Sequence, residues 1–498
     1  MLGSITLFNS PNTISVEGIG LVGGLQGKGS AECPEQIRKY LSQYILSELS
    51  SEDDLNINSL IESLNTAVVI IEGVMPVEDS GKEYFDLKVI AYPGTQTVSL
   101  ENGWLYHSEL KRINTFGINT DILADAEGPI FTDQISDLPI DGRIGYILGG
   151  GKVFAKYIIG LVLNNDDFEL TNNIRNRLNF RFGRNTARAV KAGIIEVTVP
   201  TKYKTQRKKF VELLKTMYVY DIPENEPNRV GKHIQQIINQ PESNDGEYAL
   251  ETIGNNSLNQ LSILLGAPDE HVRLRAARCM LNLRSDEGMG VLIETVLDKQ
   301  SPYRIEALEA VTESGRASDA SSLAQELMKD ESFDIRLAAY EQLHKLNDSS
   351  INVKPIASVF YVEKIEQPVR KDIYVTRSGQ PKVVLMGTSI SCNKGFLIKS
   401  ANNEITIEAP VDQDYVIVTR EFPDRPDLTG NIKCTYELGD IIQALCNELP
   451  ERGQITRGGL GVSYSDIIAL LKQMCDKGAI NAQFHAGPIP KIDLNVKK

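Results

Sequence analysis

The feature that most constrains the fold of this chain is a sequence repeat in its middle. Three segments align on an arginine that recurs at intervals of about 31 to 32 residues, at Arg273, Arg304 and Arg336. Apolar residues follow helical spacing in each segment, and a second helix-like segment precedes each one. Repeats of this length are typical of two-helix solenoids, so we expect three helix pairs over residues 257–348.

A solenoid of this kind would resemble HEAT repeats. One helix pair cannot bury its apolar face alone, and three pairs are near the minimum for a continuous core. Solenoids present extended concave surfaces, which favours the binding of a partner. An ordinary helical bundle is the alternative interpretation of the same segments.

Residues 1–150 are rich in predicted strands. Residues 66–76 and 85–94 are β-branched runs that end in turn residues. Residues 34–49 instead carry apolar side chains at helical spacing, and Pro34 suits the first turn of a helix. We therefore expect a β-rich first domain that contains one helix.

A glycine-rich run follows the first predicted strand, at Gly18, Gly20, Gly23, Gly24, Gly27 and Gly29. Residues 18–23 match GxGxxG, but a dinucleotide fingerprint opens directly into a helix, and no helix can begin here before Pro34. The sequence around Lys28 also lacks the first glycine and the hydroxyl residue of a P-loop. The run thus predicts a turn in which two backbones approach closely, with no cofactor.

Residues 151–222 change to an alternating pattern. Strands are predicted at 158–163, 189–200 and 218–221, with helices at 168–179, capped by Asp166, and at 206–217. This order is typical of a split α/β module of the ferredoxin-like type, and such modules commonly associate side by side. The order alone proves no function.

The remaining segments complete an α+β, multi-domain chain. Residues 223–256 are polar and predict a linker with a short helix at 230–239. Residues 349–498 return to β-rich sequence and end in a helix pair, predicted at 438–449 and 463–478. We expect Ser465 to be the N-cap and Gly478 the C-cap of the last helix.

No catalytic or metal-binding pattern stands out. The chain has no GxSxG elbow and no CxxC pair, and its histidines are scattered, at His107, His233, His271, His344 and His485. Asp166-Asp167 is most simply a helix cap beside an acidic first turn, and Asp53-Asp54 a solvated loop. We expect no catalytic, cofactor or metal site.

The cysteines leave two interpretations open. Three of the six, Cys434, Cys446 and Cys475, fall late in the chain. One pair among them could form a disulfide in an oxidising compartment, and buried free thiols are the alternative. No apolar stretch approaches the roughly 18 residues of a transmembrane helix.

Several segments together resemble the flagellar P-ring protein family. The glycine run is similar to the family's G-x-G-L-V-x-G-L-x-G-x-G run, and further similar segments follow in the family's order. They are Asn65–Pro76, Asp86–Val89, Ser99–Leu105, Gly149–Gly151, Leu163–Phe168, Ile195–Pro200 and Leu438–Gln483. The resemblance covers most of residues 14–222 and 372–483, and the helical repeat interrupts it as an inserted domain.

The resemblance implies a structural, non-catalytic protein. Members of the family form the periplasmic P ring around the flagellar rod at the peptidoglycan layer, where the ring serves as a bushing for motility. The implied partners are further copies of the chain, the flagellar rod, the outer-membrane L-ring proteins and peptidoglycan. The opening MLGSITLFNSPN has neither the basic nor the apolar region of a secretory signal, which departs from the family's export.

Two other functions are weighed against this one. An envelope scaffold or adaptor would use the HEAT-like repeats to bind a protein partner without a flagellar role. A nucleotide-dependent enzyme comes third, because the only phosphate-loop candidate is the glycine run.

A basic block stands out in an acidic chain, whose formal net charge is −14. Between residues 175 and 209 a single acid, Glu196, accompanies many cations. The candidate contact residues are Arg175, Arg177, Arg181, Arg184, Arg188, Lys202, Lys204, Arg207, Lys208 and Lys209. Arginine forks suit carboxylates, so we expect contact with an acidic neighbouring subunit or with peptidoglycan. A solvated helix face is the alternative, and the net charge argues against nucleic acid as a general partner.

Overall fold

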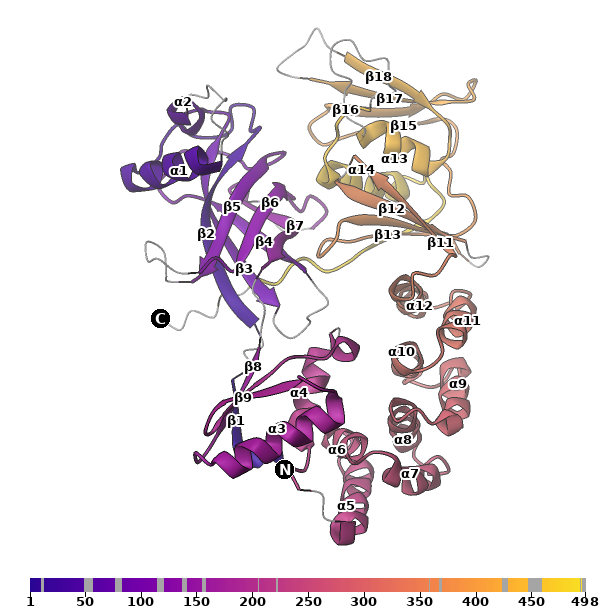
Figure 1. Cartoon of the computed structure of the whole chain (residues 1–498). Coiled ribbons are helices and arrows are strands. Elements are labelled where there is room, and N and C mark those ends of the chain that lie inside the picture. The colour runs from indigo at the N-terminus through magenta and orange to yellow at the C-terminus, as the bar shows by residue number, and fades with distance from the viewer. Residues whose placement is uncertain are drawn as a thin grey trace. The chain divides into compact units, whose positions relative to one another are not determined.

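The chain folds as an α+β protein in two compact units, as the sequence predicts for the class (Figure 1). The computed structural model describes residues 1–9, 13–48, 57–76, 83–113, 121–136, 141–154, 158–204, 206–220, 223–357, 359–366, 370–422, 429–446, 459–492 and 494. The first unit comprises Met1–Asn12, Val77–Lys82 and Lys156–Ile351. The second unit comprises Thr13–Pro76, Glu83–Ala155 and Asn352–Lys498.

A closed six-stranded barrel forms the first part of the second unit, with strand order β2-β3-β4-β7-β6-β5. Its strands are β2 (Thr13–Gly23), β3 (Ala67–Pro76), β4 (Tyr84–Ala91), β5 (Trp104–Arg112), β6 (Ala124–Pro129) and β7 (Ile144–Val153). Buried residues alternate with partly exposed ones along β4, where Phe85, Leu87 and Val89 are buried. This period of two is what a strand with one core face requires.

Two helices cover part of the barrel, α1 (Glu35–Glu48) and α2 (Ile57–Ile61). Ile37 and Leu41 of α1 pack with Ile61 of α2 against Leu21 and Val68 of the barrel strands. The predicted helix at residues 34–49 is therefore observed, and its apolar side chains form a core with β2 and β3.

The C-terminal part of the second unit contains two sheets and two helices. One sheet has the order β11-β12-β14-β13-β19 and the other β15-β16-β17-β18. The strands are β11 (Ile351–Ile356), β12 (Phe360–Ile365), β13 (Asp372–Val375), β14 (Lys382–Met386), β15 (Phe396–Lys399), β16 (Ile405–Ala409), β17 (Val416–Glu421), β18 (Thr429–Cys434) and β19 (Gln483–Ala486). The helices α13 (Leu438–Cys446) and α14 (Tyr464–Asp476) share one hydrophobic core with both sheets.

The caps of two helices differ by one or two residues from those predicted. Helix α14 is capped by Ser463, whose hydroxyl accepts from the Asp466 amide, and not by Ser465. Helix α3 (Phe168–Phe182) is capped by Asp167 and not by Asp166. The predicted end of α13, residues 447–449, and the Asp53-Asp54 loop lie outside the described residues.

The first unit opens with a four-stranded antiparallel sheet of order β1-β8-β10-β9. Its strands are β1 (Thr6–Asn9), β8 (Ile159–Leu163), β9 (Ala187–Lys191) and β10 (Ile194–Val197). Helices α3 and α4 (Arg207–Thr216) supply Ile174, Leu178 and Phe210 to the core of this sheet.

This arrangement differs from the predicted alternation in two places. Residues 189–200 do not form one strand, because a turn at Gly193, with φ of +78°, divides them into the β9–β10 hairpin. Residues 218–220 form no strand, and β1 occupies the edge of β8 instead, pairing Thr6 with Leu163. The observed order is strand, helix, two strands, helix, with a fourth strand from the chain's start.

A succession of helices forms the rest of the first unit. They are α5 (Glu226–Asn239), α6 (Asp245–Ile253), α7 (Leu258–Leu264), α8 (Glu270–Asn282), α9 (Met289–Leu297), α10 (Arg304–Ser314), α11 (Ala317–Leu327) and α12 (Phe333–Lys345). Each of the six helices predicted from the repeat is present. Residues 226–253 form two further helices where the sequence predicts a linker with one, and Ile237 and Leu250 share a core with α7 and α8.

Candidate functional site

The first half of the glycine run lies in strand β2 rather than in the predicted turn. A Cβ atom added to Gly18 would lie 2.6 Å from the Glu109 carbonyl oxygen. One added to Gly20 would lie 2.5 Å from Ser108 Oγ, and one on Gly23 would lie 2.4 Å from the Tyr106 hydroxyl. All three contacts are with β5, the strand that closes the barrel against β2. Glycine at these positions lets the closing strands approach each other.

The second half of the run forms a tight turn, and backbone amides of this turn donate hydrogen bonds within the chain. Gly24 and Gly27 have φ of +78° and +82°, which suits glycine. The Gly27 amide donates to Asn65 Oδ1, and the Gly29 amide donates to the Leu64 carbonyl. A phosphate loop needs such amides turned towards the ligand. Helix α1 begins only at Glu35, so the geometry lacks the helix start of a dinucleotide site.

The basic block spreads over α3, the β9–β10 hairpin and α4 of the first unit. Arg181, Arg184, Arg188, Lys202, Lys204 and Lys208 are exposed, and Arg175, Arg177 and Lys209 are half-buried. Arg207 is only 3% exposed, so it lies beneath the surface that the other members form.

Some cations of the block have partners within the chain. Arg188 Nη2 lies 2.8 Å from Glu196 Oε2, and Lys209 Nζ lies 3.6 Å from Glu251 Oε2. Arg181 Nη2 donates to the Glu251 carbonyl oxygen at 2.6 Å. Glu251 therefore links the block to helix α6.

An open cavity of about 650 Å³ lies where the block meets the helices. Four cationic side chains and one carboxylate line it, from Arg177, Arg181, Lys202, Arg284 and Glu251. Partial removal from solvent lowers the pKa of Lys202; Glu251 opposes this change, whereas Arg284, Lys209 and Arg181 reinforce it. The sequence predicted the basic block. It did not predict that Arg284 and Glu251 would join the block in this cavity, because no sequence spacing brings them next to α3.

A second cavity, of about 440 Å³, lies between α1 and the barrel, with Gly20 and Leu41 in its lining. At its edge the Tyr44 hydroxyl lies 2.6 Å from His107 Nδ1, and His107 Nε2 lies 3.1 Å from Asp125 Oδ2. Sequence reasoning missed this Tyr–His–Asp chain, since its members are distant in sequence.

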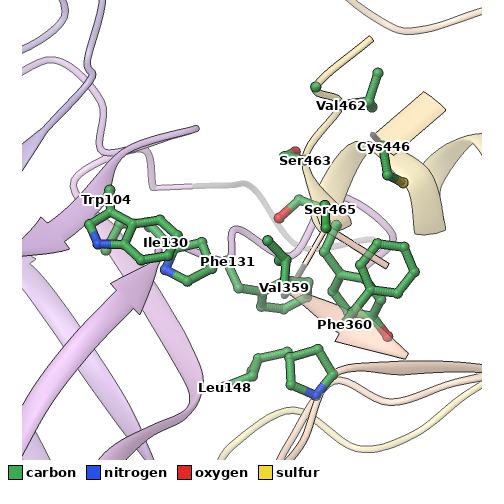
Figure 2. Close-up of a pocket in the computed structure, with 15 residues that line it drawn as sticks. Trp104, Ile130, Phe131, Leu148, Val359, Phe360, Cys446, Val462, Ser463 and Ser465 are labelled. Carbon is green, nitrogen blue, oxygen red and sulfur yellow. The ribbon is translucent and has the colours of Figure 1, made fainter. Parts of the chain in front are cut away.

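Figure 2 shows a third, mainly apolar cavity of about 240 Å³ within the second unit. Trp104, Ile130 and Phe131 approach it from the barrel, and Val359 and Phe360 approach it from the C-terminal part. Trp104 is 41% exposed, so the cavity has one partly open wall. The lining is typical of packing between two sheets, with few groups that could bind a polar ligand.

Polar contacts connect the barrel to the C-terminal part of the same unit. Asp86 accepts hydrogen bonds from Ser378 Oγ at 2.6 Å and from the Gly379 amide at 2.8 Å. The Gly149 amide donates to the same carboxylate at 2.8 Å. An ion pair between Arg377 and Asp133, with an N···O distance of 3.0 Å, adds a second contact. We call these contacts the clasp.

The cysteines of the described chain are free thiols, so no disulfide joins any pair of Cys434, Cys446 and Cys475, and the alternative interpretation of free thiols holds. Burial raises the pKa of Cys392 to about 12 and the pKa values of Cys434 and Cys475 to about 11. Thiols with raised pKa values are poor nucleophiles. Over the described residues no group of three or more metal-ligating side chains could hold an ion, and no helix has the length and apolar character to cross a membrane.

Comparison with known proteins finds relatives for the N-terminal part of the chain. A family model described as the flagellar P-ring protein matches residues 2–230. The flagellar P-ring protein of Campylobacter jejuni is 27% identical over 206 residues, covering 38% of this chain and 56% of that protein. The one from Hydrogenovibrio crunogenus is 26% identical over 219 residues, covering 41% and 56%.

A third relative extends the aligned length. The flagellar P-ring protein of Wigglesworthia glossinidia brevipalpis is 26% identical over 277 residues, covering 50% of this chain and 71% of that protein. In the first two comparisons the chain spans about half the length of the relatives it matches. The predicted resemblance is confirmed over this part of the chain: residues 2–230 match the flagellar P-ring family model.

Proposed function

We propose that the chain is a structural, ring-forming component of the flagellar basal body. The observation that carries this proposal is the family match over residues 2–230. That range contains all six barrel strands and the four-stranded sheet of the first unit. The matched sequence thus includes every strand of the barrel and of this sheet.

In detail, copies of the chain would form the periplasmic P ring around the rod at the peptidoglycan layer, as a non-catalytic bushing. The partners would be further copies, the rod, the L-ring proteins and peptidoglycan. A closed barrel suits this mechanical role, because closure leaves no free strand edge and fixes the wall by continuous backbone hydrogen bonds.

Two parts of the chain would have separate tasks. Residues 151–222 would act as a ferredoxin-like module of the ring-building type, supported by its antiparallel sheet and two covering helices. Residues 257–348 would be a HEAT-like insert that follows the 223–256 segment and adds a peripheral surface, supported by its successive helices. The domains would be completed by residues 1–150 and 349–498.

The exposed face of the basic block would contact an acidic face of the next copy or peptidoglycan carboxylates. A head-to-tail contact of this kind closes into a ring when the rotation permits. Arg181 and Arg188 already have partners within the chain, so reversing them would also disturb the unit. Arg184→Glu with Lys208→Glu is the cleaner variant, because both side chains are exposed.

The charge reversal should abolish or strongly reduce ring assembly, measured by electron microscopy of purified basal bodies. Lys232→Glu with Lys299→Glu is the matched control, since it makes the same charge change at exposed sites on helices α5 and after α9. Normal rings from the Arg184→Glu/Lys208→Glu variant would exclude the basic block as the lateral contact.

The proposed function itself is tested by basal bodies from a strain that lacks the gene. We expect a rod that persists without the ring at the peptidoglycan layer, and restoration of the ring by the wild-type gene. Basal bodies with a normal ring would contradict the proposal and would favour a scaffold or adaptor role for the helices.

A further inference from the structure

The cationic cavity of the first unit has a charge distribution that its own residues do not balance. Its single carboxylate, Glu251, is 3% exposed and already lies 3.6 Å from Lys209 Nζ. Within the described chain, no salt bridge joins Lys202 or Arg284 to an acidic residue. Lys202 instead lies over the Tyr203 ring, with its Nζ 5.2 Å from the ring centroid.

Helix ends account for part of this arrangement. Helices α3, α6 and α8 all end in the cavity lining, at Phe182, Ile253 and Asn282. A helix C-terminus carries about half a negative charge, which favours nearby cations. Three such ends neutralise only part of the charges of Lys202 and Arg284, so positive charge remains in the cavity.

The same helix ends limit which anion can bind. Compact phosphate sites usually rest on backbone amides at helix N-termini or in glycine nests. Here the helices present their carbonyl ends, so side chains must supply the donors. Arginine forks and a lysine distributed over about 650 Å³ suit carboxylates that are separated from one another.

We propose that this cavity binds a molecule with two or more separated carboxylates. The carboxylates would form ion pairs with the exposed side chains of Lys202 and Arg284, while the exposed ring of Phe180 would cover the carbon chain. The source would be either an acidic segment of a second copy of this chain or a free polycarboxylate. Binding at this cavity does not depend on ring formation, so the binding test is independent of the basal-body test.

Isothermal titration calorimetry of the full chain with citrate at low ionic strength tests the chemistry. We expect citrate to bind, acetate and inorganic phosphate to bind at least about tenfold more weakly, and added salt to weaken all binding. The Lys202→Gln/Arg284→Gln variant should bind citrate at least about tenfold more weakly than the wild type.

Arg184→Gln with Lys208→Gln is the matched control, because it removes the same charge from exposed cations of the block that do not line the cavity. Loss of affinity equal to that of the cavity variant would overturn the proposal, as would the absence of citrate binding to the wild type. Thermal unfolding of both variants checks that each is folded.

Light scattering of the full chain with and without citrate distinguishes the two sources of the carboxylates. Citrate that both binds and dissociates assemblies would identify a second copy as the source. Citrate that binds while assembly is unchanged would identify a free polycarboxylate. Rings could still form if citrate failed to bind, so this test and the basal-body test can fail independently.

Discussion

Backbone contact at a single glycine constrains how the loop after β2 packs against the chain just before β3. A Cβ atom added to Gly29 would lie 2.1 Å from the Thr66 carbonyl oxygen and 2.7 Å from that of Leu64. Both atoms belong to the backbone just before β3, so no side-chain rotation can relieve the overlap. The glycine run thus acts through close packing within one chain.

Gly29→Ala should destabilise the second unit by more than about 3 kcal/mol or prevent its folding, because backbone must move to admit the methyl group. Gly27→Ala is the matched control. Its Cβ would meet nothing within 4 Å, and only its φ of +82° is unfavourable, which costs about 1–2 kcal/mol. Urea unfolding of both variants measures the difference, and equal losses would show that the close approach is unimportant.

His233 gives the first unit a pH-dependent stability. The side chain is fully buried, with Nε2 3.0 Å from the Tyr218 hydroxyl and Nδ1 2.5 Å from Gln236 Oε1. Burial lowers its pKa; the Gln236 hydrogen bond and Asp245 oppose this, and Lys232 reinforces it. Since the folded pKa lies below the unfolded value of about 6.5, the unfolded chain binds more protons as the pH falls.

We therefore expect the free energy of unfolding of the first unit to decrease as the pH falls below about 6.5. His233→Gln should be less stable than wild type at pH 7, because two hydrogen bonds are altered, but its stability should fall less between about pH 7 and pH 5. Chemical denaturation across this range measures both quantities. An unchanged slope in the variant would assign the pH dependence to other groups.

At the scale of the elements, a buried ionic network holds the helices α6, α8 and α10 together. Glu247 of α6 is 4% exposed and accepts from Arg275 Nε at 2.6 Å and from Arg278 Nη2 at 2.9 Å. Arg278 also pairs with Glu306 of α10. Arg275 is completely buried and donates to the carbonyl oxygens of Ile237, Gln240 and Ser243.

Glu247→Gln should destabilise the first unit by about 3–5 kcal/mol, because it leaves buried guanidinium charge without its carboxylate. Arg316→Gln is the control, since its pair with Asp286 is 73% and 65% exposed and should contribute less than about 1 kcal/mol. Thermal unfolding measures both losses. A small loss for Glu247→Gln would mean that water or rearranged side chains compensate the charge.

Local periodicity predicts the helices of the first unit well, and contacts across long sequence distances explain what it missed. The helices after residue 257 follow the apolar repeat, which is a property of each segment alone. Strand β1 is only four residues long, and its partner β8 lies about 150 residues away, so no window of sequence contains the pair. The β9–β10 hairpin was missed because β-branched residues flank Gly193 on both sides of a short turn.

The candidate site also combines a feature that local sequence predicts with contacts that it does not predict. Charge density along residues 175–209 predicts the basic block, because its members are neighbours in sequence. The cavity also needs Glu251 and Arg284, which arrive from the ends of α6 and α8. The packing of α4 and α8 against α6 brings these residues together, and sequence spacing does not encode it.

At the scale of the whole molecule, each unit encloses its own hydrophobic cores. One core of the second unit combines Phe131, which follows β6, and Leu148 of β7 with residues between 356 and 480. Two cores of the first unit combine its sheet with helices α3 and α4, and helices α5 to α8 with one another. A domain with a hydrophobic core of its own can fold and unfold independently, so we expect the two units to unfold separately.

Calorimetry of the full chain should therefore resolve two thermal transitions. Glu247→Gln should lower only the melting temperature of the first unit. Asp86→Asn should lower only the melting temperature of the second unit, by about 2–4 °C for each kcal/mol lost. The Asp86 carboxylate accepts three hydrogen bonds on its two oxygens, and an asparagine amide has only one oxygen with which to accept them. Hydrogen exchange measured by mass spectrometry assigns each transition to its residues.

One transition shifted by both variants would show that the two units unfold cooperatively, in contradiction to this expectation. Two separately shifted transitions would mean that the chain can lose the order of its helical unit while its barrel stays folded. In that case mutations in the first unit, including those in the cationic cavity, can be tested for assembly without loss of the barrel. The ring proposal and the cavity proposal then become separable in one set of variants.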